Sequence, residues 1–414
     1  MPPATTRAQK PFDVIVVGAT GYVGALIAEY LATSYRGNEV RWAIAGRNRA
    51  KLEALKTSLG KPAEGLTILE ADTDDEDALD ALTAKGRVIL TTVGPYAKYG
   101  SKLVAACVRS GTDYCDLAGE APWIQRMIDT HQAQAEETGA RIVPCCGFDS
   151  IPSDLGVLFL NDEVKKRTGS PCSAVRMRVM SMKGGASGGT IASMMNMAEE
   201  VFRDERVRDA MSNPFALNPQ GERKGPRQPG SVPVRYDQDA KAWTAPFIMA
   251  AINTRVVHRS NAVMDYAYGR DFTYEEAMVT GGSLLGAPTA LAVTGAMGAF
   301  GLAAVVPPTR ALLNRFVLPK PGEGPTPEQR ERGRFDLLFI GTGVDGKTYK
   351  ARVTGDRDPG YGSTAKMISE AALCLNECKP GAPEGGFWTP ASAMGQTLIE
   401  RLRANAGLTF GMVE

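Results

Sequence analysis

The stretch Val14-Ile-Val-Val-Gly-Ala-Thr-Gly-Tyr-Val-Gly24 decides the fold of the first part of this chain. A short apolar run leads directly into three glycines, Gly18, Gly21 and Gly24, which are spaced three residues apart. This order is typical of a buried parallel strand, a tight turn and a helix whose N-terminus faces a pyrophosphate, because the free N–H groups and the helix dipole there attract negative charge. The amphipathic run Tyr22–Ala32 stands where that helix is required. The stretch therefore predicts a dinucleotide-binding site.

Length and composition indicate a globular protein of two domains. The chain has 414 residues, and a single hydrophobic core rarely grows beyond about 250–300 residues. A net charge of +1 gives no reason to expect nucleic acid as a partner. The seven cysteines have no CxxC spacing, so we expect reduced thiols. The first ten residues lack the apolar run of a secretory signal, so we expect a cytoplasmic location. His131 and His258 are the only histidines and do not suffice for a zinc site, so no metal is expected.

Residues 1–150 alternate β-rich runs with helical ones, as βαβ units do. The expected strands are Val14–Val17, Val40–Ala45, Leu66–Ala71, Val88–Val93, Tyr114–Leu117 and Arg141–Pro144. The expected helices are Tyr22–Ala32, Arg49–Leu59, Asp74–Ala84, Ser101–Ser110 and Pro122–Thr138. Near-continuous apolar strands imply a parallel sheet that is buried on both faces. We therefore predict an α/β fold with an N-terminal, Rossmann-type, doubly wound domain.

The rhythm changes after Ser150, where we predict an α+β domain for substrate binding or oligomerisation over residues 151–360. Its expected elements are a strand at Ala174–Met182, a helix at Ile191–Arg203, a surface loop at Asn213–Pro233, and an antiparallel pair at Phe335–Thr342 and Lys347–Gly355. The tail, residues 361–414, reads as two helices, Ser363–Leu375 and Pro390–Ala406. We expect these helices to pack back on the first domain.

One segment of the second domain is unusually apolar. Residues 277–309 contain no charged side chain, and their length would allow a crossing of the ~30 Å hydrocarbon core. Glycine and alanine dominate, Pro288 interrupts the run, and no aromatic belt flanks it. Three interpretations stay open: a buried or dimer-forming helical hairpin, a lid or membrane-contacting surface for an apolar substrate, and a transmembrane helix.

The end of the second expected strand indicates which cofactor binds. Sites that prefer NAD place an Asp or Glu there, whereas this strand ends in Arg47 and Asn48. A guanidinium is suited to a 2′-phosphate, so the sequence favours NADP over NAD. Asp72 and Thr73 are placed to meet the adenine. The expected NADP-binding residues are Gly18, Ala19, Thr20, Gly21, Tyr22, Val23, Gly24, Arg47, Asn48, Asp72, Thr73, Val93, Gly94, Pro95, Tyr96, Gly147 and Phe148.

Several blocks spread over the chain resemble the saccharopine dehydrogenase-like oxidoreductases, and among them the mycobacterial trans-acting enoyl reductases. The matching blocks are Gly18-Ala-Thr-Gly-Tyr-Val-Gly24, Val93-Gly-Pro-Tyr96, Tyr114-Cys-Asp-Leu-Ala-Gly-Glu120, Gly147-Phe-Asp-Ser-Ile-Pro-Ser-Asp-Leu-Gly156, Pro359-Gly-Tyr-Gly362 and Thr389-Pro-Ala-Ser-Ala-Met-Gly395. The resemblance implies an NADPH-dependent reductase of a 2,3 double bond in a polyketide-derived acyl chain, carried on a polyketide synthase during phthiocerol-type lipid assembly. An apolar, carrier-bound acyl substrate and a polyketide synthase are the implied partners.

Reduction of an enoyl thioester needs a hydride at Cβ and a proton at Cα, and the cofactor supplies the hydride. Candidate proton donors or substrate contacts are Tyr96, Asp149, Ser150, Lys183 and Tyr361. Each has an alternative role: Tyr96 could pack on the cofactor, and Ser150, or Ser153 with Asp154, could cap the helix that starts near Pro152. Tyr114, Asp116 and Glu120 form another polar set, in which Asp116 reads as a structural hydrogen-bond acceptor.

Two other functions stay open. The first is an imine or amino-acid dehydrogenase, although no cluster of arginines is evident that would hold a substrate carboxylate. The second is a non-catalytic NADP-binding sensor or scaffold, in which side chains would block the nicotinamide face. Membrane contact and a homodimer likewise remain open from the sequence.

Overall fold

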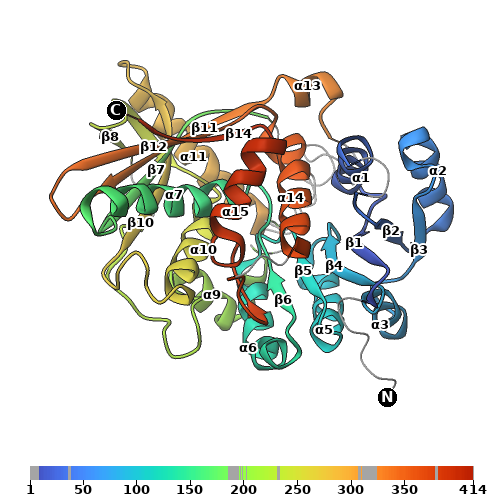
Figure 1. The fold of residues 1–414 in the computed structure, drawn as a ribbon. Helices are drawn as coiled ribbons and strands as arrows, with labels where there is room; N and C mark the ends of the chain where they lie inside the picture. The colour runs from blue at the N-terminus through green and yellow to red at the C-terminus, as the bar shows by residue number, and fades with distance from the viewer. Residues whose placement is uncertain are drawn as a thin grey trace.

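The fold is seen in a computed structural model that describes residues 9–35, 39–184, 195, 197, 199–201, 203–230, 234–305, 309, 324–377 and 381–413. The described residues form two seven-stranded sheets with helices between and around them (Figure 1), and we call the parts built on these sheets the first and the second domain. The expected helix Ile191–Arg203 lies largely outside the described residues.

The first sheet is parallel throughout, in the order β13-β6-β5-β4-β1-β2-β3. Its strands are β1 (Phe12–Val17), β2 (Trp42–Gly46), β3 (Thr67–Glu70), β4 (Gly86–Thr91), β5 (Asp113–Cys115), β6 (Arg141–Val143) and β13 (Gly386–Phe387). Its connecting helices are α1 (Tyr22–Ser34), α2 (Arg49–Leu59), α3 (Glu76–Thr83), α4 (Tyr96–Tyr99), α5 (Ser101–Arg109) and α6 (Ala121–Thr138). Side chains of β1 are buried on both faces of the sheet, one against α1 and the other against α3, α5 and α6. This confirms the predicted α/β fold with a doubly wound parallel sheet.

The second sheet is mixed, in the order β14-β12-β11-β7-β10-β9-β8, and only β7 and β10 pair in parallel. Its strands are β7 (Ala174–Lys183), β8 (Arg235–Asp237), β9 (Ala242–Pro246), β10 (Thr273–Gly281), β11 (Arg334–Thr342), β12 (Thr348–Gly355) and β14 (Leu408–Val413). The helices around it are α7 (Ile151–Thr168), α9 (Glu205–Ser212), α10 (Ala250–Val263), α11 (Gly286–Val305) and α13 (Pro327–Glu331). The expected antiparallel pair is β11 with β12.

The last part of the chain joins both sheets. Helix α14 (Thr364–Glu377) packs on α1 and on strands of the first sheet, as expected for the tail. Helix α15 (Pro390–Asn405) packs on α7 and α14, between the two sheets (Figure 1). The purely helical interpretation of the tail was incomplete. β13 extends the first sheet beside β6, and β14 pairs with β12 of the second sheet.

The apolar segment forms the end of β10 followed by one continuous helix, α11, rather than a hairpin. The window Gly286–Ala304 is long and apolar enough to cross a membrane by length and composition, yet only 11% of it is buried. Leu284 and Leu285 precede this helix and are 95% and 74% exposed, and Leu291 and Leu302 lie exposed along it. The interpretation as a buried core hairpin is therefore wrong for the described part of this segment.

A buried ion-pair cluster holds three strands of the second sheet together. Arg178 of β7 is fully buried, and its guanidinium bonds Asp237 of β8, at 2.7 Å, and Glu275 of β10. Arg176, two residues earlier and partly exposed, reaches Asp237 and Asp239 from outside. Loss of one partner from a buried ion pair leaves an uncompensated buried charge. This lowers the free energy of unfolding far more than loss of an exposed ion pair does.

Replacement of Arg178 by Met is expected to lower the free energy of unfolding by about 3–5 kcal/mol, because two buried carboxylates lose their main cation. The matched control, Arg176→Met, removes a partly exposed cation from the same strand and should cost about 1 kcal/mol or less. Urea unfolding monitored by circular dichroism measures both values. Equal losses for the two variants would contradict the role assigned to Arg178.

Candidate active site

The glycine turn between β1 and α1 has the geometry of a phosphate-binding loop. Gly18 adopts φ = +82°, a conformation that residues with a Cβ rarely take. A Cβ on Gly24 would lie 2.3 Å from the carbonyl oxygen of Gly18, so only glycine allows the helix to approach the turn this closely. Helix α1 begins at Tyr22 without a side-chain cap or an acidic residue in its first turn. Its N-terminal N–H groups and dipole are therefore available to an anion.

The far end of the site carries an exposed cation. Arg47 follows β2 directly and, within the described part of the chain, makes no ion pair. Asn48 caps α2, because its Oδ1 accepts the Lys51 N–H at 3.0 Å. Asp72 accepts the Asp74 N–H at 3.1 Å, and Thr73 follows it after β3. Arg47 is thus the cation in this set, and no carboxylate of the described chain neutralises it.

A cavity of about 460 Å³ opens at the carboxyl ends of the first sheet's strands. One wall belongs to the first domain, and its residues adjoin the glycine turn or follow β4, β5 and β6: Val23, Thr92, Gly94, Tyr96, Leu117, Gly119, Glu120, Ala121 and Asp149. The opposite wall is apolar and comes from the second domain: Met197, Val201, Met211, Ile248, Met249, Ala251, Ile252, Met297, Phe300, Gly301 and Ala304. Gly360 and Thr364 complete the lining. The inner face of α11 therefore roofs a cavity that begins beside the glycine turn.

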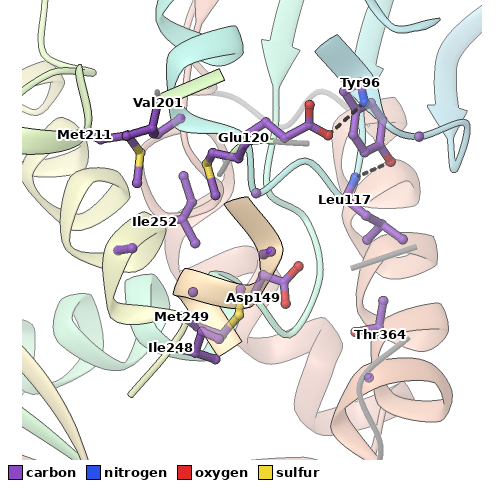
Figure 2. Close-up of a pocket in the computed structure, with 18 of the residues that line it drawn as sticks. Tyr96, Leu117, Glu120, Asp149, Val201, Met211, Ile248, Met249, Ile252 and Thr364 are labelled. Carbon is purple, nitrogen blue, oxygen red and sulfur yellow. Dashed lines mark hydrogen bonds between the residues drawn. The ribbon is translucent and has the colours of Figure 1, made fainter. Parts of the chain in front are cut away.

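Two carboxyl groups line this cavity, and their surroundings differ. The carboxylate of Glu120 accepts the backbone N–H groups of Tyr96 and Ala97, each at 2.8 Å, and so holds the loop after β4. Asp149 makes no hydrogen bond in the described structure, and Figure 2 shows its carboxyl group in the space between Met249 and Leu117. Burial raises the pKa of Asp149 to about 6. Asp149 is thus an unengaged acid whose pKa lies near neutrality, as a proton donor requires.

Tyr96 lines the same cavity, but its hydroxyl is used inside the protein. That hydroxyl donates to the carbonyl of Thr91 at 3.3 Å and accepts the Leu117 N–H at 3.1 Å, as Figure 2 shows for the second bond. The ring packs against Trp123, with centroids 5.6 Å apart. Burial, with Asp116 nearby, raises the pKa of the phenol well above its usual value. This environment favours a packing role and does not favour proton donation.

The other three catalytic candidates do not line the cavity. Ser150 is fully buried and donates to Oδ1 of Asn253 at 3.0 Å, so it neither meets the cavity nor caps α7 with its side chain. Lys183 is exposed at the end of β7. Tyr361 is buried with its ring edge-on to Tyr22, at a centroid distance of 4.8 Å. Tyr361 therefore packs on the first residue of α1, beside the glycine turn.

Two buried carboxyl groups that sequence reasoning treated as minor position the loop that carries Asp149. Asp116 accepts hydrogen bonds from Tyr114 Oη and from the N–H groups of Ala118 and Cys145, at 2.8–3.0 Å, and joins the ends of β5 and β6. This is the structural acceptor role considered for it. Asp154 accepts the Ala391 N–H at 2.8 Å and binds Ser260, so it caps α15 rather than its own helix. Only the tertiary fold brings Asp154 and the tail together.

Gly147 and Phe148 are buried and position the same loop. The Phe148 N–H donates to Oγ1 of Thr364 at 3.0 Å, which ties the strand end to α14. A Cβ on Gly147 would lie 2.7 Å from Leu117, so the glycine permits the close passage of two cavity-wall loops. Gly147 therefore acts through its backbone, whereas the Phe148 ring also packs against Phe335, with centroids 4.8 Å apart.

Comparison with known proteins decides the family. The saccharopine dehydrogenase NADP binding domain matches residues 14–143. A protein of Mycobacterium tuberculosis that carries a provisional trans-acting enoyl reductase name is 43% identical over 98% of both chains. Trans-acting enoyl reductases of Mycobacterium tuberculosis and Mycobacterium ulcerans are 39% and 37% identical, over 98% and 96% of this chain and 98% and 97% of theirs. The chain belongs to the trans-acting enoyl reductases of the saccharopine dehydrogenase-like family.

Among solved structures, the apo saccharopine dehydrogenase of Saccharomyces cerevisiae shares the fold, with a TM-score of 0.50, 14% identity, and coverage of 97% of this chain and 100% of that chain. The family match shows an NADP-dependent oxidoreductase, which confirms the predicted cofactor and enzyme class. The residues of this chain fit that cofactor. The N-terminus of α1 would hold the diphosphate, Arg47 the 2′-phosphate, and the loop of Val93, Gly94 and Pro95 would border the nicotinamide.

Replacement of Arg47 by Gln should weaken NADPH binding by about 2 kcal/mol, or roughly thirtyfold, because a charge-assisted contact to the 2′-phosphate is lost. NADH binding should change by less than about twofold, since NADH has no such phosphate. Arg49→Gln is the matched control, because Arg49 already pairs with Glu53 on α2. Isothermal titration with both nucleotides measures the effect, and an equal loss for NADPH and NADH would contradict it.

Proposed function

We propose that this protein reduces the 2,3 double bond of an apolar acyl thioester with NADPH, acting in trans on a polyketide synthase. The observation that carries the proposal is the cavity, which begins at the glycine turn and continues as an apolar channel under α11. No lysine or arginine is among the described residues that line it, so it offers no partner for the carboxylate of an amino acid. The names of the relatives, trans-acting enoyl reductases, support the same reaction and the same kind of partner.

Bound NADPH would supply a hydride to Cβ of the acyl chain. The residues of this chain then have two tasks, to exclude water and to deliver a proton to Cα. Methionines and isoleucines of the second domain, with Phe300 of α11, provide the water-poor wall. Asp149 is the acid that faces this space without another partner, and we assign to it the proton that Cα receives. The carboxylate so formed would take its next proton from solvent once product leaves.

Replacement of Asp149 by Asn should lower kcat by roughly 10²–10⁴-fold, the usual size of a general-acid contribution, with little change in NADPH affinity. In the unmodified enzyme, kcat should fall as pH rises through about 6, because the protonated form of Asp149 is the donor. The variant should lose that pH dependence. Unchanged kcat with an unchanged pH profile would contradict the assignment.

Stability offers an independent check of the same group. Since the folded state raises the pKa of Asp149 above that of an unfolded chain, its ionisation costs stability above about pH 6 and costs nothing below about pH 4. Asp149→Asn should therefore increase the free energy of unfolding at pH 8 and leave it unchanged at pH 4.

The reaction itself is tested with a long-chain 2-enoyl thioester of N-acetylcysteamine. NADPH absorbance should fall with this compound and should not fall with the saturated thioester. Mass spectrometry should find the saturated acyl product. Oxidation of NADPH by a 2-oxo acid with an amine, without any reaction of the enoyl thioester, would favour the amino-acid dehydrogenase instead. Tight NADPH binding with neither reaction would favour a sensor or scaffold.

A cytoplasmic location beside the synthase is part of this proposal. The leucines on the outer face of α11 are exposed in the described chain, so contact of this face with a membrane or with a second copy stays a prediction. The inner face of the same helix roofs the cavity, which favours the lid interpretation of this segment over a transmembrane helix.

A further inference from the structure

A second, larger cavity adjoins the one that holds Asp149. Its volume is about 1170 Å³, and it lies among α9, α10, β10 and the loop of residues 213–230. Met211, Ile248, Ala251 and Met297 line both cavities and therefore form the partition between them. Figure 2 shows Met211 and Ile248 on the side of the first cavity that lies away from Thr364. An elongated molecule could thus occupy both cavities after small rotations of unbranched methionine side chains.

The wall of the second cavity includes a residue with a buried polar atom that has no protein partner. Nε2 of His258 makes no hydrogen bond, although the side chain is only 3% exposed. The imidazole packs beside the rings of Phe215 and Phe272, with centroids 4.7 Å and 6.2 Å away. Burial lowers its pKa to about 3, so the ring is neutral. An unpaired buried nitrogen costs roughly 1–3 kcal/mol, a cost that an amide group of a ligand would remove.

The mouth of this cavity presents cations on an anchored loop. Lys224 and Arg227 are exposed and make no ion pair in the part of the chain that the structure describes. Arg223, just before them, pairs with Asp129 of α6, and its carbonyl accepts a hydrogen bond from Asn213 at 3.1 Å.

The other end of this loop is also fixed. Gln228 donates to the carbonyls of Pro226 and Phe272, each at 3.2 Å, and accepts the Tyr274 N–H at 3.1 Å. Gly225 lies against the ring of Phe215, where a Cβ would come within 2.5 Å of it. The backbone that carries Lys224 and Arg227 is therefore anchored on both sides of these two residues.

Opposing charge is scarce inside the cavity. Glu276 is the carboxyl group among its described lining residues, and it is occupied by Tyr274 Oη at 2.7 Å and Asn253 Nδ2 at 3.0 Å. Burial raises the pKa of Glu276 to about 7, which reduces its negative charge near neutral pH. Arg255 is buried and donates to the carbonyls of Ala210, Ala251 and Met211 rather than to a carboxylate. The charged side chains that line this cavity are therefore mainly cationic.

We propose that the second cavity binds the phosphopantetheine arm of the acyl thioester, with its phosphate at Lys224 and Arg227 and an amide at His258. The thioester then passes the methionine partition, and the double bond lies beside Asp149. A cavity with an unpaired buried imidazole nitrogen in its wall and exposed cations among its lining residues matches a chain that carries amides and a phosphate. This inference rests on the proposed function, because it places the substrate of that reaction. The same arm is present in free coenzyme A and in carrier proteins.

The test compares 2-dodecenoyl thioesters of pantetheine, of phosphopantetheine and of a phosphopantetheinylated carrier protein. The first two differ only in the phosphate. For the double variant Lys224→Gln, Arg227→Gln, KM should rise roughly tenfold for the two phosphate-containing thioesters, with kcat unchanged. KM for the pantetheine thioester should not change. The control, Lys165→Gln with Lys166→Gln, removes the same charge from the exposed end of α7 and should leave all three substrates unaffected.

Equal effects on the thioesters with and without phosphate would overturn the proposal. An effect on the carrier-protein substrate alone would also overturn it, since that result indicates contact with the carrier's surface and not with the phosphate. Binding of saturated dodecanoyl phosphopantetheine and dodecanoyl pantetheine, followed by calorimetry, separates this test from the proposed function. If no thioester is reduced, the proposed reaction fails, and the phosphate site is still judged by whether the double variant weakens only the phosphorylated ligand.

Discussion

The close contact between α1 and the turn after β1 is the constraint on which the rest of the site depends. Without a side chain at Gly24, the helix lies directly against the carbonyl of Gly18, and its first N–H groups point out of the sheet. Tyr22 then stands at the start of the helix, where Tyr361 packs against it and Arg330 donates to its hydroxyl at 2.6 Å. The same turn thus forms the proposed cofactor site and is contacted by Arg330 and Tyr361 from later in the chain.

Buried polar groups then fix two helices and a strand of the second domain against one another beside the cavity. Asn253 of α10 bonds Ser150, Ser153 and Glu276, which lie on or just before α7 and on β10. Such groups stabilise only when all of them are paired, so they define one arrangement of the helices more sharply than apolar contacts would. Asp149 immediately precedes this network, which explains why a loop residue holds a fixed place in the cavity wall.

Local sequence patterns were sufficient to predict most of the first sheet, but they were insufficient to predict which residues line the cavity. The apolar runs and the glycine triplet are local features, and they predicted six of the seven strands of that sheet and its connecting helices except the short α4. β13 has only two residues, Gly386 and Phe387, too few for any periodicity. Tyr96 and Ser150 were reasonable candidates by type and position, yet their hydroxyls are satisfied by Thr91 and Asn253, partners that only the tertiary fold reveals. His258 gave no signal, because a lone histidine is usually a packed core residue.

The path of the last residues limits how this molecule can move. After α14 the chain adds a strand to the first sheet at β13, crosses along α15, and ends as β14 in the second sheet. The chain therefore passes between the two sheets three times, from β6 to β7, from β12 to β13 and from β13 to β14, so a hinge between them would have to bend three connections together. Because α11 lines the cavity and much of it is exposed, we expect a long chain to enter by a shift of α11 and the neighbouring methionines. In this arrangement α11 would act as a lid over the cavity.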